Sequence, residues 1–278
     1  MPNYSGVWDL KEQGVAVKGD RWQLAPISSS DAVFLAEGAS SSSSYLNTIT
    51  MLSISTLGRS SDFGDLTHAR YDMGASSSST RGLFSGGFDG SPYSNVIDYI
   101  TMASTGDATD FGNLSAGDNG GRAVSNSSRA VHKLGYTSGG SSDTMEYVTI
   151  ASTGNGTDFG DLNTAVYSGG VGITSSGTYG YVCNGKNTAG SDGIAEVQYI
   201  TIASTGNAQD FGDLNIRRFN SQSGNKTKGL SIVGNDGSHL ASVDIFTMST
   251  SGSGSDWGDL SSSSYNGAAL SSTHGGLS

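Results

Sequence analysis

Pairs of aspartates are the side chains best placed to do chemistry in this sequence. The string Asp-Phe-Gly-Asp-Leu, or a close variant of it, begins at Asp62, Asp110, Asp158, Asp210 and Asp256. Two carboxylates per copy could bind Ca²⁺, which takes six to eight oxygen ligands. The spacing does not match a known calcium loop, however, and Asn113 replaces the second aspartate of the second copy. We therefore interpret each copy as a structural turn, in which the first Asp caps the backbone and the Gly permits the bend, and we predict no metal site.

The other polar residues give little support to catalysis. The four glutamates are scattered, whereas a glycosidase needs two carboxyl groups close together. The four histidines lie in different repeats and never at the spacing of metal ligands. Serine is abundant, but no Gly-x-Ser-x-Gly motif occurs at a strand-to-helix turn. We predict that the protein is not an enzyme and needs no cofactor, and a carbohydrate-active enzyme stays as an alternative. The single cysteine, Cys183, is expected to be a buried small apolar residue.

The charge and the hydropathy pattern exclude several classes of partner. The 278 residues carry 25 acidic and 14 basic side chains, a net charge of −11, whereas nucleic-acid binding needs clustered Lys and Arg. No apolar run approaches the roughly 18 residues of a membrane span. The first residues also lack a basic stretch followed by an apolar one. We expect no nucleic-acid partner, no membrane span and no signal peptide.

The aspartate strings mark five repeat units, with start-to-start steps of 48, 48, 52 and 46 residues. A second string, rich in β-branched and aromatic residues, precedes each copy and reads as a strand. In unit three, Met145 and Tyr147 fall on one face of this strand, and Val148 and Ile150 fall on the other. Large apolar groups on both faces predict a strand that is covered on both sides.

The order of these strings resembles the Kelch repeat. Its marks are a glycine pair, such as Gly86–Gly87, then an aromatic-x-x-Leu and an Arg, such as Phe63, Leu66 and Arg70. The resemblance implies an all-β, Kelch-like β-propeller of five blades, each of about 48 residues, over residues 31–278. An open β-solenoid of the same repeats is the alternative. Residues 1–30 lie outside the repeats.

A second resemblance concerns function. The string Tyr199–Asn207 and the aspartate motif are similar to repeats of virion proteins of marine tailed phages, and Gly6–Gln13 is similar to the openings of phage tail and fibre proteins. The resemblance implies a non-enzymatic structural or binding protein of the virion, a tail fibre or appendage protein that presents loops for host-surface recognition. Such a protein is made in the host cytoplasm and works in the extracellular particle. An architectural capsid decoration or connector protein is the alternative.

The loop after the glycine pair varies most in length between units, and such variation marks the binding face of repeat proteins. Aromatic and polar side chains in these loops would contact a host glycan or a host protein. The candidates are Phe88, Tyr93, Lys186, Asn187 and His239. In the segment 1–30, Trp8 and Trp22 are the candidates for anchoring the chain to other virion proteins. Assembly into a homo-oligomer stays open.

Overall fold

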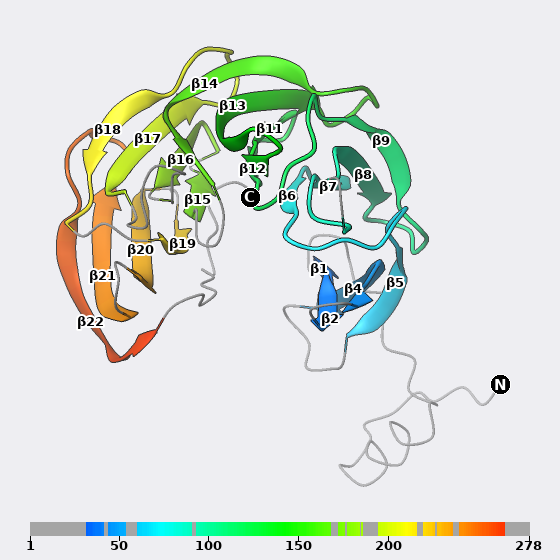
Figure 1. Ribbon diagram of the computed structural model, residues 1–278, viewed down its shortest axis with the longest axis horizontal. Helices are drawn as coiled ribbons and strands as arrows, with labels where there is room; N and C mark the ends of the chain where they lie inside the picture. Colours follow the sequence, from blue (N-terminus) through cyan, green and yellow to red (C-terminus); the bar gives the residue numbers. More distant parts are fainter. Residues whose placement is uncertain are drawn as a thin grey trace, which may run out of the picture.

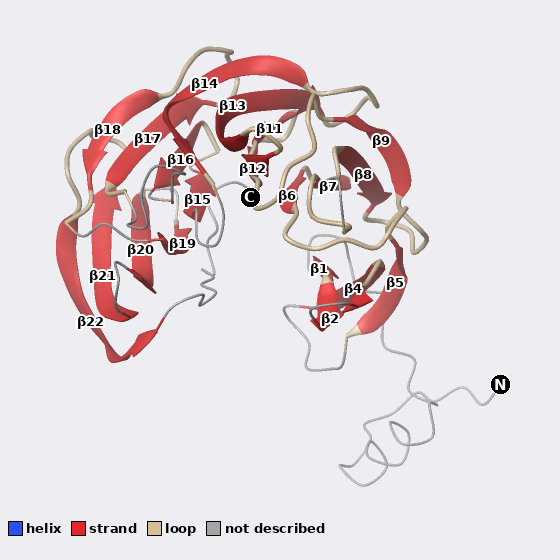
Figure 2. Cartoon of the chain, in the orientation of Figure 1, coloured by secondary structure: helices blue, strands red, loops and turns tan. Residues whose placement is uncertain are grey.

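The structure is a computed structural model, and it describes residues 32–41, 44–53, 60–90, 93–167, 172–175, 177–183, 185, 194–215, 219–225, 227–235 and 239–264. Within these residues every regular element is a β-strand, so the predicted all-β class is confirmed. Figure 2 shows these strands joined by loops. The described residues contain no helix that could cross a membrane. The predicted anchoring segment, with Trp8 and Trp22, lies outside the described residues.

Each repeat unit forms its own antiparallel sheet. Unit one contains β1 (Ala32–Ala36), β4 (Thr48–Ser53) and β5 (Ser61–Asp65), with a hairpin of β2 (Ala39–Ser41) and β3 (Ser44–Tyr45). Unit two contains β6 (Gly74–Ser77), β7 (Arg81–Ser85), β8 (Val96–Thr101) and β9 (Thr109–Asn113). Unit three contains β10 (Arg122–Ser125), β11 (Arg129–Lys133), β12 (Tyr136–Thr137), β13 (Gly140–Thr149) and β14 (Thr157–Val166).

Units four and five continue the same pattern. Unit four contains β15 (Gly172–Ser175), β16 (Tyr179–Cys183), β17 (Glu196–Thr201) and β18 (Gln209–Asp213). Unit five contains β19 (Phe219–Gly224), β20 (Lys228–Asn235), β21 (His239–Thr247) and β22 (Ser255–Ser264). Figure 1 shows the five sheets following one another along an open arc. Strands β6, β15 and β19 lie on the inner side of the arc (Figure 1). Strand β10 contacts both β6 and β15, and β15 contacts β19.

The hydrophobic core lies between neighbouring sheets rather than within one of them. One cluster joins units one and two, another joins units two and three, and two more join the later pairs. The two faces of β13 contribute to different clusters: Met145 and Tyr147 pack toward unit four, and Val148 and Ile150 pack toward unit two. The prediction of a strand covered on both sides is therefore confirmed. Cys183 is buried in the cluster between units four and five, as expected.

The Asp-Phe-Gly-Asp motif corrects one prediction, because it is not a turn. It forms the outermost strand of each sheet, as in β9, where Ile97 pairs with Gly112 but the next residue, Asp98, pairs with Asp110. The extra residue, Phe111, makes a β-bulge, and Gly112 takes a φ of +147° that L side chains rarely adopt. The expected capping does occur, since Gly112 N donates to Asp110 Oδ1 at 3.1 Å.

Each outer strand also binds the next unit along the chain. Gly106 N donates to Phe63 O, and Ala108 N donates to Asp65 O, both at 2.8 Å, and equivalent pairs join each later unit to its successor. The motif aromatic and leucine of the first four units, such as Phe111 and Leu114, are buried in these junctions as predicted. The glycine is needed for packing too, because a Cβ at Gly64 would lie 2.3 Å from Gly106 O.

Candidate functional site

The structure brings two of the predicted binding residues together. Phe88 and Tyr93 stand at the two ends of one loop of unit two, with their ring centroids 5.7 Å apart. The backbone of His239 opens β21 and pairs with Asn235, and nothing further is described of its side chain. Lys186 and Asn187 lie outside the described residues. The binding role of Phe88 and Tyr93 stays a prediction.

Phe88 and Tyr93 belong to a row of half-buried aromatic rings across units one to three, here called the aromatic row. Its members are Tyr45, Tyr71, Phe88, Tyr93, Tyr136 and Tyr167. Successive ring centroids are 4.9–6.1 Å apart, within the range of favourable aromatic pairs. All six residues keep part of their surface exposed to solvent. Such rings offer apolar area with a polar hydroxyl tip, which is typical of contact residues at binding surfaces.

The antiparallel order of the strands explains why these rings meet. In such a sheet, the loop between the second and third strands lies at the same end as the connection to the next unit. The two segments then pair: Phe88 N donates to Tyr71 O at 2.8 Å, and Tyr136 N donates to Asn119 O at 2.7 Å. Units one to three therefore add rings to one end of the molecule, which we call the glycine-pair end because Gly86–Gly87 lies there.

A buried ion pair holds the loop that carries Phe88 and Tyr93. Arg70 Nη1 donates to Asp98 Oδ2 at 2.9 Å, and neither side chain is exposed to solvent (0% for both). The same guanidinium group donates to Gly86 O at 3.0 Å and to Phe84 O at 3.3 Å. Arg70 thus fixes the glycine pair from which the loop departs. Thr67 donates two further hydrogen bonds to the Asp98 carboxylate, one from its backbone amide and one from its hydroxyl group.

Polar groups line one side of the row. His68 Nε2 lies 3.0 Å from Ser94 Oγ and 3.6 Å from Asp89 Oδ2, and both partners belong to the loop of Phe88 and Tyr93. Burial, and then the charge of Arg70, lower the pKa of His68, which favours the neutral ring. Burial also raises the pKa of Tyr71, which keeps its hydroxyl group as a neutral donor. The surface therefore combines apolar rings with uncharged donors.

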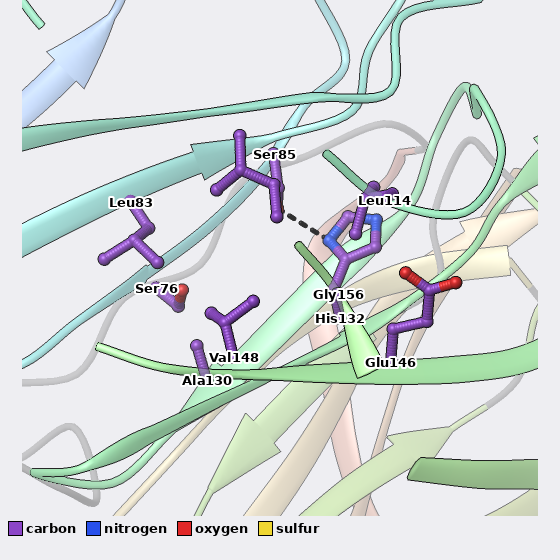
Figure 3. Close-up of a pocket in the computed structure, with 10 residues that line it drawn as sticks. Ser76, Leu83, Ser85, Leu114, Ala130, His132, Glu146, Val148 and Gly156 are labelled. Atoms are coloured by element: carbon purple, nitrogen blue, oxygen red, sulfur yellow. Dashed lines mark hydrogen bonds between the residues drawn. The ribbon is translucent and has the colours of Figure 1, made fainter. Parts of the chain in front are cut away.

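A second polar group, between units two and three, has the residue types of a catalytic triad. Ser85 Oγ lies 2.7 Å from His132 Nδ1 (Figure 3). On the other side of the ring, His132 Nε2 lies 3.4 Å from Asp118 Oδ2. Sequence reasoning missed this group because its members come from three separate segments. The cavity beside Ser85 and His132 has a volume of about 10 Å³, which is room for one water molecule. Since all three side chains are buried, a substrate has no access to Ser85, and we interpret the group as structural.

No cluster of three or more metal-ligating side chains occurs among the residues that the structure describes. The motif aspartates are instead engaged with the backbone. Asp158 Oδ1 accepts from Gly160 N at 3.2 Å, and Asp107 Oδ1 of unit two accepts from Asp65 N of unit one at 3.0 Å. Asp158 thus holds the bulge of its own strand, whereas Asp107, which lies outside the motif in the loop between β8 and β9, joins unit two to the outer strand of unit one.

Comparison with known proteins supports the fold alone. No protein-family model matches the chain, and no curated protein matches its sequence. Among solved structures, the chain is similar to that of YjhT, with a TM-score of 0.68 and 9% sequence identity. The match covers 86% of this chain and 84% of YjhT. Similarity at so low an identity concerns architecture and leaves function to be argued from the residues.

Proposed function

We propose that the chain is a Kelch-like β-propeller of five units. The sheet topology supports this architecture over the open solenoid. The strands of each unit pair in chain order into one antiparallel sheet, and neighbouring sheets pack face to face through their apolar residues. In a β-solenoid the equivalent strands of successive repeats would pair with each other instead. Strands β6, β10, β15 and β19 contact one another in succession, and β6, β15 and β19 lie on the concave side of the arc, as propeller blades require.

In this proposal the protein is a non-enzymatic component of a tailed-phage virion, a tail fibre or appendage protein that binds the host surface. The aromatic row carries the binding part of the proposal. It gathers partly exposed rings from three units on one end of the molecule, where the variable loops also lie. The virion assignment depends on the resemblance of Tyr199–Asn207 and the aspartate motif to repeats of phage particle proteins.

Replacing Phe88 and Tyr93 with Ala is expected to reduce adsorption to host cells by tenfold or more, since aromatic anchors at interfaces each contribute about 2 kcal/mol or more. The measurement is the binding of labelled protein to cells of the host. Tyr179→Ala is the matched control, because Tyr179 is an exposed tyrosine at the start of β16, outside the aromatic row. Equal adsorption by the double variant and the control would contradict a role of the row in host binding.

The virion assignment is tested by immunogold electron microscopy of purified particles with an antibody against residues 31–278. We expect label at the tail or its fibres. Deletion of residues 1–30 should give a folded protein that no longer joins the particle, since the anchor is assigned to Trp8 and Trp22 in this segment. Label over the capsid would favour the architectural alternative. Particles without label would show that the protein is not a virion component. Incorporation of the deletion variant into particles would show that residues 1–30 are not the anchor.

A further inference from the structure

The four junctions between successive units are copies of one interface. On one side stand the aromatic and the leucine of the outer strand, such as Phe63 and Leu66 of unit one. On the other side stand apolar residues of the next unit's second and third strands, such as Phe84 and Ile100. The two sides are therefore different from each other, and each unit carries one of each. Among the described residues no unit precedes unit one and none follows unit five, so one side of the interface has no partner unit at each end.

Unit five exposes its outgoing side. Trp257 and Leu260 occupy the places of the buried Phe and Leu of the earlier units, yet they are 63% and 43% exposed. A Cβ at Gly258 would meet nothing within 4 Å, whereas one at Gly212 in unit four would lie 2.7 Å from Gly252 C. The outer strand β22 thus keeps the aromatic, the glycine and the leucine of the interface, and no unit among the described residues packs against them.

Unit one exposes the complementary side. By the pairing of strands, Val33 and Leu35 in β1 occupy the places of Gly82 and Phe84 in β7. They are 45% and 52% exposed, whereas Gly82 and Phe84 are buried against unit one. Leu35 and Trp257 therefore belong to the two halves of an interface that the chain already forms four times. In Figure 1 the two end units, with β22 and β1, face each other across the opening of the arc.

We propose that these two faces bind each other within one molecule, so that the arc closes into a ring with unit five against unit one. Both faces belong to one chain, so their effective concentration is high, on the order of millimolar for faces tethered at this range, and contact within the chain outcompetes contact between copies. Closure also removes from water the large apolar side chains that each end exposes.

The proposed contact between unit five and unit one is here called the seam. Its residues suit a junction that is wider than the other four. Trp257 replaces the Phe of the other four units, and Val33 replaces the Gly or Ala found at its place in the others. At internal junctions this place is tight, since a Cβ at Gly180 would lie 2.7 Å from Val124 Cγ2. Larger residues on both sides of the seam fill more space.

Disulfide cross-linking tests closure. Leu35→Cys with Leu260→Cys replaces two exposed residues, and a Cys183→Ala background, shared by the seam pair and the control pair, removes the buried thiol. The control pair, Ser77→Cys with Ser125→Cys, spans the junction of units two and three, where Ser125 Oγ donates to Ser77 O at 2.8 Å. We expect both pairs to form a disulfide within the monomer on mild oxidation. This inference rests on the proposed propeller architecture but not on host binding.

The outcomes separate the two proposals. If the control pair links and the seam pair does not, or links only between molecules, closure is wrong while the architecture stands. If the control pair also fails, the architecture itself is wrong. A second measurement compares Gly258→Ala with Gly160→Ala, whose φ values are +130° and +132°. Closure predicts equal falls in melting temperature for both variants, whereas a distinctly smaller fall for Gly258→Ala would show that nothing covers β22.

Discussion

Replacing Arg70 with Met is expected to lower the free energy of unfolding by about 3–5 kcal/mol. Arg70 and Asp98 are both 0% exposed, and their charged atoms lie 2.9 Å apart. Removing the guanidinium group leaves the Asp98 carboxylate buried without a counter-charge, and Thr67 alone cannot replace the lost interaction. Gly86 O and Phe84 O lose a donor as well. The measurement is urea-induced unfolding of the variant and of the unaltered protein.

Arg122→Met is the matched control. Arg122 lies at the same end of the molecule and contacts Asp72 at 3.2 Å, but both side chains are about a quarter exposed. Ion pairs of this kind typically contribute less than about 1 kcal/mol. A double change, Arg70→Met with Asp98→Leu, should recover much of the loss, because no charge then stays buried. Equal losses for Arg70→Met and Arg122→Met would show that burial of the pair is not what matters.

The same pair shows what the sequence could and could not predict. The sequence predicts a strand over Val96–Thr101, and β8 spans these residues. Its polar residue, however, is fully buried, and so are its counterparts Glu146, Gln198 and Asp244. Units two to five thus each carry one polar residue at the same position of this strand. That repetition, which is visible in the sequence, indicates that the four residues make the same contact. Each is hydrogen-bonded by the residue that follows the motif leucine of the preceding unit, as in Ser115 N to Glu146.

The misplaced turn has a physical reason. Asp, Gly and Asn favour turns, and Asp-Phe-Gly-Asp reads as one on propensity alone. The same residues also suit a bulged outer strand, because Gly112 provides the positive φ and Asp110 caps the freed amide. The choice between the two depends on backbone hydrogen bonds from the next unit, such as Gly154 N to Phe111 O. A contact between residues about 40 positions apart is not encoded in local propensity.

The aromatic row was predicted only in part. Phe88 and Tyr93 were chosen because their loop varies between units. Tyr71 and Tyr167 lie in the connections between units, which had no such variation to mark them. Only the pairing of a connection with the next unit's loop, as between Tyr71 and Phe88, brings the rings into one row. Once the repeat is known, the strand order predicts that these connections lie at the same end of the molecule as the loops between the second and third strands. The aromatic residues of both are then expected to lie close together.

Lys133 is expected to make the stability of the protein depend on pH in the alkaline range. Its ammonium group is fully buried in β11 and has no hydrogen-bond partner among the described residues. Burial lowers the pKa of Lys133 from 10.5 to about 7, although the nearby charges of Asp118 and Asp72 oppose this shift and Arg122 adds to it. Between these two pH values the unfolded chain holds a proton that the folded protein does not. Stability therefore rises with pH, by up to about 1.4 kcal/mol per pH unit, and the contribution is constant below about pH 7.

Lys133→Met should remove this rise, because Met fills a similar volume without a charge to desolvate. The measurement is the free energy of unfolding in urea at several pH values between about 7 and 10. The difference between variant and unaltered protein isolates Lys133, since Tyr71 and Tyr181, whose pKa values burial raises, titrate alike in both. Lys228→Met, at an exposed lysine opening β20, should leave the slope unchanged. If the free energy of unfolding of Lys133→Met rises with pH as steeply as that of the unaltered protein, the prediction is wrong. The ammonium group of Lys133 would then reach water or a hydrogen-bond partner, and β11 would be less buried than the structure shows.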